Sequence, residues 1–250
     1  MYKVLIIFLL TPFIMIGQKS GKVTYDMTIK VEIPDRVPQQ FRDRIPKEQK
    51  VIKELYFDES ESNYKTGERA EEEAGIEENE FSRRFRRRFG RGMGTGQTYK
   101  DIAGDKMIDK RNLMDKDFVI YGILPEYKWK VTGQKKQVLT YLVMEATTTV
   151  GDSIAVSAWF APQIPVSNGP GTYQGLPGLI LELNIDNGKQ VIVANNVALG
   201  PIEDGIIEIP SKGKEVTMEE FEAIRKEKTK EMREQRGAGG LGNGRGRGGA

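Results

Sequence analysis

The sequence predicts a mainly β protein built on an antiparallel sheet. Between residues 98 and 209 the chain is a succession of short runs rich in β-branched and aromatic residues. The joints between these runs carry turn-forming residues, as in Gly151-Asp152 and Asp186-Asn187-Gly188. Few segments have the length or pattern of a helix. Many short strands with tight joints and few helices indicate an antiparallel β fold.

The first residues predict a secretory signal peptide over residues 1–17. Lys3 gives a basic start, residues 4–16 are apolar, and Gly17-Gln18 follow. A membrane-spanning helix needs about 20 apolar residues, and this stretch is shorter. We therefore expect a signal peptide that is cleaved near Gly17-Gln18. The alternative is an uncleaved N-terminal anchor. No cysteine follows the apolar stretch, which excludes a lipid anchor. We therefore expect an exported protein.

The next segments are expected to belong to a β domain over residues 18–210. Its first strand is indicated by apolar residues that alternate with polar ones. These apolar residues are Val23, Tyr25, Met27, Ile29 and Val31. Residues 35–54 are polar and contain two prolines, which predicts short helical pieces, and strand character resumes over 54–67.

Segregated charges interrupt this domain over residues 67–97. Seven glutamates occupy the first half of the segment and six arginines the second, a composition typical of disorder. The arginines are Arg83, Arg84, Arg86, Arg87, Arg88 and Arg91. After Pro210, residues 211–236 are predicted to form an exposed helix with a capping box at Thr217–Glu220, and this helix is expected to dock weakly or not at all. Residues 237–250 are rich in glycine and arginine and predict a flexible tail.

The passage IPVSNGPGTYQGLPGLILEL, residues 164–183, is the most specific in the chain. Within it, Leu176-Pro177-Gly178-Leu179 suits a type II turn. Pro177 fixes φ at the second position of this turn, and Gly178 accepts a positive φ at the third. A structural role therefore explains the passage without any chemistry, and we favour that interpretation.

This passage and its flanks resemble the GLPGLI family, exported proteins of Gram-negative bacteria. The family is named for six residues, here Gly175, Leu176, Pro177, Gly178, Leu179 and Ile180. The resemblance covers about residues 98–200 and includes Ala158-Trp159-Phe160 upstream. Members often carry a cysteine where this chain has Val143, so any thiol role is absent here. The resemblance implies an exported location and no established reaction.

A looser likeness links the chain to the curved antiparallel sheets of periplasmic lipoprotein carriers. It implies a curved sheet or half-barrel whose concave face contains Trp129 or Trp159. Because one fold serves many functions, this likeness implies a shape and not an activity.

Composition argues against catalysis and metal binding. The chain has no histidine and no cysteine, so the usual general bases, thiol nucleophiles and zinc ligands are missing. Residues 184–188 weakly resemble a calcium loop, but they lack its later acidic ligands and are explained as a hairpin. Met93, Met107 and Met114 are explained by core packing rather than by copper binding. We expect no cofactor, no metal and no enzymatic activity.

The arginine run raises nucleic acid as a partner, because arginines neutralise phosphates and the interleaved phenylalanines can stack on bases. Export, a formal net charge of only +2 and the adjacent glutamates argue against it. A self-paired loop is favoured, followed by contact with an anionic surface such as lipopolysaccharide or with a protein partner. No other segment has the length of a transmembrane helix.

We therefore expect a non-catalytic binding or accessory protein of the bacterial envelope, periplasmic or on the cell surface. Its partner would be a small apolar ligand in the concave face or an outer-membrane protein. The main alternative is a structural or adhesive protein that its arginine-rich segments hold to lipopolysaccharide. An enzyme is the third alternative.

Overall fold

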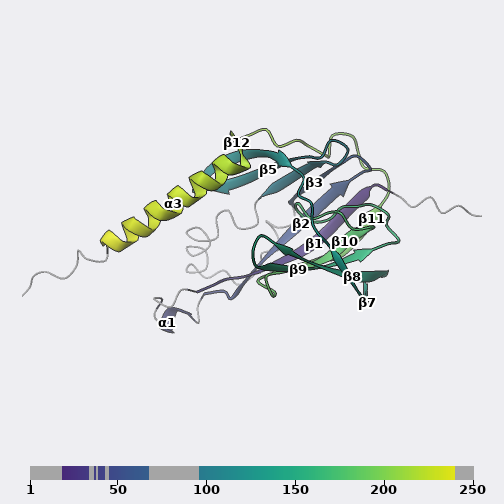
Figure 1. Cartoon of the computed structure of the whole chain (residues 1–250), viewed down its shortest axis with the longest axis horizontal. Coiled ribbons are helices and arrows are strands. Elements are labelled where there is room, and N and C mark those ends of the chain that lie inside the picture. The colour runs from purple at the N-terminus through teal and green to yellow at the C-terminus, as the bar shows by residue number, and fades with distance from the viewer. Residues whose placement is uncertain (1–18, 34–36, 38, 43–44, 68–95, 240–250) are drawn as a thin grey trace, which may run out of the picture.

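A computed structural model describes residues 19–33, 37, 39–42, 45–67 and 96–239. The expected signal peptide, the six arginines of the charged insertion and the last residues of the tail lie outside this part of the chain. The described residues form a twelve-stranded sheet and a long C-terminal helix (Figure 1). The prediction of a mainly β fold is confirmed.

The strands are short and close in sequence, as the turn-forming joints predict. Their bounds are β1 Gly21–Lys30, β2 Glu48–Phe57, β3 Glu61–Thr66, β4 Gln97–Asp101, β5 Lys106–Leu113, β6 Lys116–Ile123, β7 Lys130–Val138, β8 Tyr141–Val150, β9 Ile154–Ala161, β10 Leu179–Ile185, β11 Gln190–Leu199 and β12 Lys214–Thr217. The helices are α1 Gln39–Arg42 and α3 Met218–Gly239.

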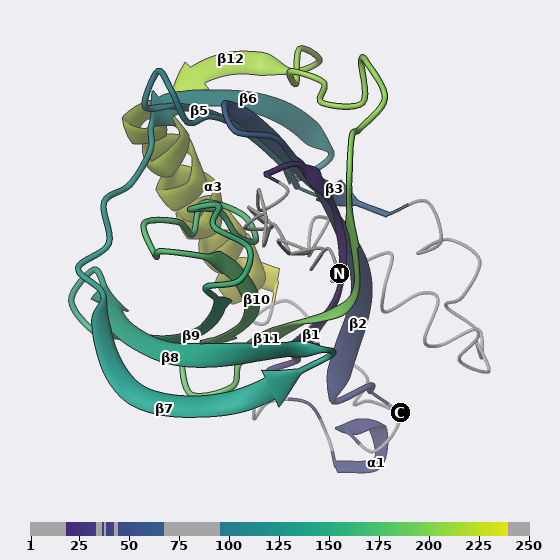
Figure 2. The same ribbon diagram turned by 90° about the vertical axis from the view of Figure 1, so that its right-hand side faces the viewer.

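The sheet consists of two antiparallel meanders that share one seam. Strands β1 to β6 form the first meander and β7 to β11 the second, and β1 pairs with β11 between them. Strand β12 adds to β6 in parallel, so β12 and β7 are the two edges and the sheet stays open. The sheet curls strongly around its own interior, the half-barrel that was expected (Figure 2).

The two predicted turns are confirmed as hairpins. Gly151 has a φ of +59° between β8 and β9. Asp186, Asn187 and Gly188 have φ values of +52°, +52° and +83° between β10 and β11. Asparagine, aspartate and glycine tolerate this left-handed backbone best, which is why these residues mark the turns in the sequence.

The inner, concave face of the sheet carries the main core. Val23 and Tyr25 of β1 share this face with Leu55 of β2, and Leu183 and Ile192 continue it across β10 and β11. Each is buried, and burial of apolar surface contributes about 25 cal/mol per Å². The alternate residues of β1 point to the outer face and are polar, as the period of two predicts.

Residues 162–178, which connect β9 to β10, fill part of this interior and are called the inner loop below. Ile164, Val166 and Leu176 of the loop are buried in the main core. The loop also reaches the first meander, where Lys100 of β4 donates to the carbonyl oxygen of Gly169. Since β4 and β10 lie five strands apart in the sheet, the loop must cross the concave side between them.

Two local predictions are corrected by the structure. Residues 48–54 were expected to be helical, yet they form the first part of β2 and pair with β1. Tertiary pairing overrides their polar composition, because β1 offers an unpaired edge. Residues 214–217 were predicted to belong to the exposed helix and instead form β12, which pairs with β6.

Helix α3 begins at the predicted capping box. Thr217 N donates to Glu220 Oε2 at 2.8 Å, and Glu220 N donates to Thr217 Oγ1 at 3.2 Å. The first turn docks through Phe221, whose ring meets that of Phe118 at 5.5 Å between centroids, and the rest of the helix projects from the sheet (Figure 1). Among the described residues, no helix combines the length and apolar character needed to cross a membrane.

Candidate functional site

A groove of about 480 Å³ crosses the outer face of the second meander and is called the outer groove below. Most of its lining residues carry a hydroxyl, amide or ammonium group, and none carries a carboxylate. The lining residues are Lys128, Lys130, Thr147, Thr148, Thr149, Ala155, Val156, Ser157, Asn184 and Asn187.

Strand pairing explains why these polar groups meet. Lys130 of β7 pairs with Thr147 of β8, which pairs with Ser157 of β9, which pairs with Asn184 of β10. Paired residues place their side chains on the same face of a sheet, so the four form one row across four strands. The row presents ammonium, hydroxyl and amide groups to one bound molecule.

The neighbouring row carries two carboxylates, each already engaged. Glu145 of β8 accepts hydrogen bonds from Ser157 Oγ at 2.8 Å and from Thr132 Oγ1 at 2.7 Å. Glu182 of β10 forms an ion pair of 2.6 Å with Lys136. These contacts fix the orientation of Ser157 at the floor of the groove. They also occupy the two carboxylates that flank it.

Trp159 lies between these two carboxylates, and the prediction that it lines the concave face is wrong. It pairs with Glu182 and Glu145, and Glu182 pairs in turn with Val193 opposite Asp26 on the outer face. The ammonium of Lys136 lies 4.2 Å from the centre of the Trp159 ring. Only the register decides which face an alternating strand presents, and a one-residue shift exchanges the faces.

Trp129, the other predicted aromatic residue, packs against the inner loop. Its Nε1 donates to the carbonyl oxygen of Gln174 at 2.7 Å. Its ring belongs to a cluster with Tyr127 and Tyr173, which stack at 5.0 Å between centroids. Tyr127 Oη also lies 2.8 Å from Thr172 Oγ1. Trp129 and Tyr127 therefore hold the inner loop from the segment that precedes β7.

The family motif forms the end of the inner loop, with a different geometry from the predicted type II turn. Gly178 has a φ of +159°, far from the value of about +80° that such a turn requires. Leu179 N donates to Ile164 O, and Leu176 O accepts from Gly178 N. Gly178 is needed because a Cβ there would clash with the carbonyl oxygen of Ala161. Both the close approach to the backbone of β9 and a φ that residues with a side chain rarely adopt explain this glycine.

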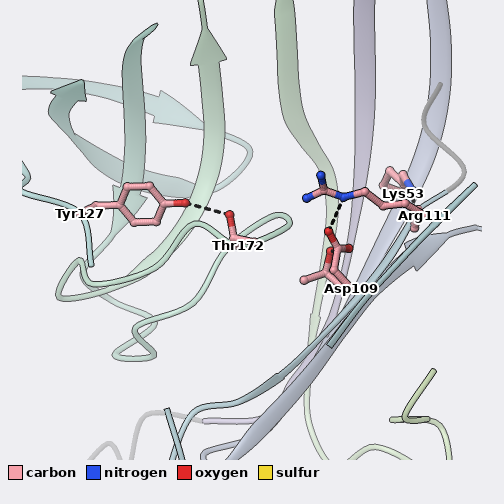
Figure 3. A network of polar contacts seen from close by, with 7 residues as sticks. Lys53, Asp109, Arg111, Tyr127 and Thr172 are labelled. Carbon is pink, nitrogen blue, oxygen red and sulfur yellow. Dashed lines mark hydrogen bonds and ion pairs between the residues drawn. The ribbon is translucent and has the colours of Figure 1, made fainter. Parts of the chain in front are cut away.

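A polar network lies on the inner face of the first meander, which sequence reasoning did not predict. Asp109 of β5 accepts from Arg111 Nε at 2.6 Å and from Thr98 Oγ1 at 3.0 Å. Lys53 of β2 donates to Thr66 Oγ1 and to Gly96 O. Burial lowers the pKa of Lys53 to about 8, although the charge of Asp109 raises it in part. Figure 3 shows Lys53, Asp109 and Arg111 together, with Tyr127 and Thr172 apart from them.

Lys100 of β4 is the second lysine of this face and is completely buried. Its ammonium donates to Gly169 O at 3.0 Å and to Tyr173 O at 3.4 Å, both in the inner loop. Burial lowers the pKa of Lys100 to about 7. The sequence signal for these lysines is their position on the inward side of alternating strands. The sequence alone does not reveal this position, because the inward side of a strand cannot be assigned without the pairing register.

No group of three or more acidic residues that could hold a metal occurs among the described residues. The arginines at positions 83–91 lie outside them, so their predicted contact with an anionic surface stays a prediction. Chemically, the described surfaces offer hydrogen bonds and positive charge in the outer groove and a partly satisfied polar cluster inside. Both suit binding.

The chain is similar in fold to two solved structures of PNGF-II, in the P21 and C2 space groups. Each has a TM-score of 0.51 and 14% sequence identity over 82% of this chain. The match covers 33% and 32% of those chains, so this chain spans about a third of their length. A structure of an uncharacterized conserved protein from Thermus thermophilus matches with a TM-score of 0.40 and 6% identity, over 80% of this chain and 91% of that one. A search of curated proteins found no match.

One family model matches residues 147–182, from β8 to β10. That segment contains the inner loop, the glycine-rich motif and the residues of β8 and β9 that line the outer groove. Over this segment the chain is similar to a family described as a protein of unknown function (Porph_ging).

Proposed function

We propose that the protein is a non-catalytic binding or accessory protein of the bacterial cell envelope, and that it holds a polar, negatively charged ligand in the outer groove. The observation that carries this proposal is the row Lys130, Thr147, Ser157 and Asn184. These residues come from four strands and line one groove that has no carboxylate in its lining.

The chemistry of the lining selects the class of ligand. Ammonium and amide groups donate hydrogen bonds, hydroxyl groups donate and accept them, and charge-assisted bonds to an anion are about twice as strong as neutral ones. A phosphorylated or carboxylated sugar combines the hydroxyl groups and the negative charge that such a lining recognises. An apolar ligand is disfavoured, because the inner loop already occupies the concave side of the sheet.

Three features support export and a binding role. The N-terminal residues have the layout of a signal peptide, and the glycine-rich motif resembles that of the exported GLPGLI family. In addition, Glu145 and Glu182, the carboxylates next to the groove, are engaged by Ser157, Thr132 and Lys136. These features support the proposal that the protein acts in the periplasm or on the surface of a Gram-negative bacterium.

Native mass spectrometry of the mature protein, recovered gently from its own envelope, tests the proposal. We expect extra mass that disappears on denaturation and that contains an acidic sugar. Lys128→Gln combined with Lys130→Gln should lose this mass, whereas Lys116→Gln combined with Lys135→Gln, exposed lysines outside the groove, should retain it. A bare monomer, or an adduct that all variants retain, would contradict the proposal.

The adhesive alternative is tested by a different experiment. A protein held to lipopolysaccharide by arginines should leave membranes as salt rises, and removal of residues 81–92 should abolish its attachment. Attachment that survives this removal but is lost in the Lys128 and Lys130 variant would favour the groove.

A further inference from the structure

Hydrogen-bond donors gather in the interior between β3, β4 and the inner loop. Ser62 of β3 and Lys100 of β4 are direct cross-strand partners, and neither has any exposed surface. Tyr64 follows Ser62 by two residues on β3, so it lies on the same face and is diagonal to Lys100. Diagonal neighbours in an antiparallel pair are about 7–8 Å apart, within reach of long and aromatic side chains.

Asn168 brings a fourth donor to this group from the inner loop. It precedes Gly169, whose carbonyl oxygen accepts from Lys100 Nζ, and Asn168 O accepts from Ile180 N. Tyr25 Oη donates to Ile180 O, and the rings of Tyr25 and Tyr64 meet edge to face at 6.2 Å. These contacts connect Asn168 with Tyr64 on one side and with Lys100 on the other.

The hydrogen bonds of this group are incomplete. Ser62 Oγ, Tyr64 Oη and Asn168 Nδ2 are buried, and each lacks a partner among the described residues. All three can donate. The two bonds of the Lys100 ammonium go to carbonyl oxygens, which carry no full charge. Burial is the cause that lowers the pKa of Lys100, and no carboxylate of the described residues raises it.

Of the two other buried side-chain oxygens that lack a partner among the described residues, one lies on the opposite face of the sheet and the other belongs to the inner loop. Asn63 belongs to the outer face, where its amide donates to Glu208 O. Gln174 is tied to Trp129 through its backbone. Within the described part of the chain, the inner group therefore has three donors without a partner and a lysine whose two hydrogen bonds go to carbonyl oxygens.

A bound anion would satisfy the donors that lack a partner and would balance the charge of Lys100. A buried donor without a partner costs about 1–3 kcal/mol, and an ammonium without a counter-charge costs more. A single anion accepts from several donors at once and supplies the missing negative charge, whereas a water molecule supplies no charge. We propose that Lys100, Ser62, Tyr64 and Asn168 enclose a small monoanion of halide size, held between the sheet and the inner loop.

Bromide is the probe, because its anomalous scattering distinguishes it from water in a crystal. We expect anomalous density beside Lys100 Nζ and Ser62 Oγ in crystals grown in sodium bromide. Density for a water molecule at this place, with no anomalous signal, would overturn the proposal. So would direct hydrogen bonds among the four side chains that leave no site between them.

Stability in solution gives a second, independent measurement. At constant ionic strength, replacing a large organic anion with bromide should raise the melting temperature of the wild-type protein. Ser62→Ala removes a hydroxyl that has no protein partner among the described residues, so the variant should fold and lose most of this rise. Ser211→Ala, at an exposed serine outside both this site and the outer groove, should keep it.

Tyr64→Phe provides a further test if one variant fails to fold, since it removes only a hydroxyl without a partner in the described part of the chain. An equal rise in melting temperature in wild type, Ser62→Ala and Tyr64→Phe would show that the anion acts elsewhere. The result does not depend on the proposed function, because the outer groove lies on the other face of the sheet.

Discussion

The ammonium nitrogen of Lys100 lies 3.0 Å from the carbonyl oxygen of Gly169 and so joins β4 to the inner loop. This contact links the two meanders across the concave side of the sheet. It also places a lysine where solvent cannot reach it, which makes the stability of the protein depend on pH.

We expect Lys100 to oppose folding below pH 7 and to oppose it less as the pH rises above 7. Its pKa is about 7 in the folded protein and about 10.5 when exposed, so the unfolded chain binds more protons between these values. The free energy of unfolding should therefore rise by up to about 1.4 kcal/mol per pH unit. Urea unfolding from pH 6.5 to 9.5 in halide-free buffer measures this slope.

Lys100→Met should lose the rise that begins near pH 7. The ionisable groups on the surrounding elements are Tyr25, Lys53, Tyr64, Asp109 and Tyr173. Lys53 gives a slope of the same sign from about pH 8, and this slope should remain in the variant. Burial raises the pKa of Tyr25 and Tyr64, so both titrate above the measured range. An unchanged profile in Lys100→Met would exclude Lys100 as the source.

Gly178→Ala should destabilise the protein by about 1–3 kcal/mol, because the new Cβ would clash with the backbone oxygen of Ala161. Backbone atoms of paired strands cannot move aside at low cost. Gly200→Ala is the matched control, since its φ of +150° is similar and no heavy atom of the described residues lies within 4 Å of its Cβ position. Equal urea midpoints for the two variants would refute the close-packing explanation of the motif.

Asp109→Asn should cost about 2 kcal/mol, because it removes the negative charge opposite Arg111 and near the buried Lys53. The pKa of Lys53 should fall further, since Asp109 raises it at present. Asp117→Asn removes an exposed carboxylate paired with Lys110 and should change stability by less than about 1 kcal/mol. Comparison of the two unfolding curves tests whether the inner network stabilises the first meander.

Thr217→Ala should weaken the start of α3 by about 1 kcal/mol, because Thr217 Oγ1 accepts from Glu220 N at the N-terminus of the helix. Thr229→Ala, in the middle of the same helix, removes only a bond to Arg225 O and should have little effect. Amide hydrogen exchange in the first turn of α3 measures the difference. Equal exchange in both variants would show that docking of Phe221, and not the cap, holds this turn.

The parts of the fold that the sequence predicted are those set by neighbours along the chain. The alternation of Val23, Tyr25 and Met27 identified β1, and the left-handed residues Asp186 and Asn187 marked a hairpin. The reciprocal bonds of Thr217 and Glu220 were likewise expected from their spacing of three residues. Each of these features depends on backbone geometry within a few residues.

The residues of the candidate sites were harder to predict, because their roles depend on partners far along the chain. Lys100 and Gly169 are 69 residues apart, and their contact exists only once the inner loop crosses the sheet. Residues 48–54 have a polar sequence, yet pairing with β1 makes them a strand.

The sequence by itself determined a mainly β protein, its tight turns and the cap of its last helix, because hydrophobic period and backbone preference act locally. The tertiary structure decided which face each side chain occupies. Trp159 points outward and Lys100 inward because strand register, with its bulges near Tyr25 and Ile180, is fixed by pairing between distant segments. The outer groove and the buried donors both follow from that register.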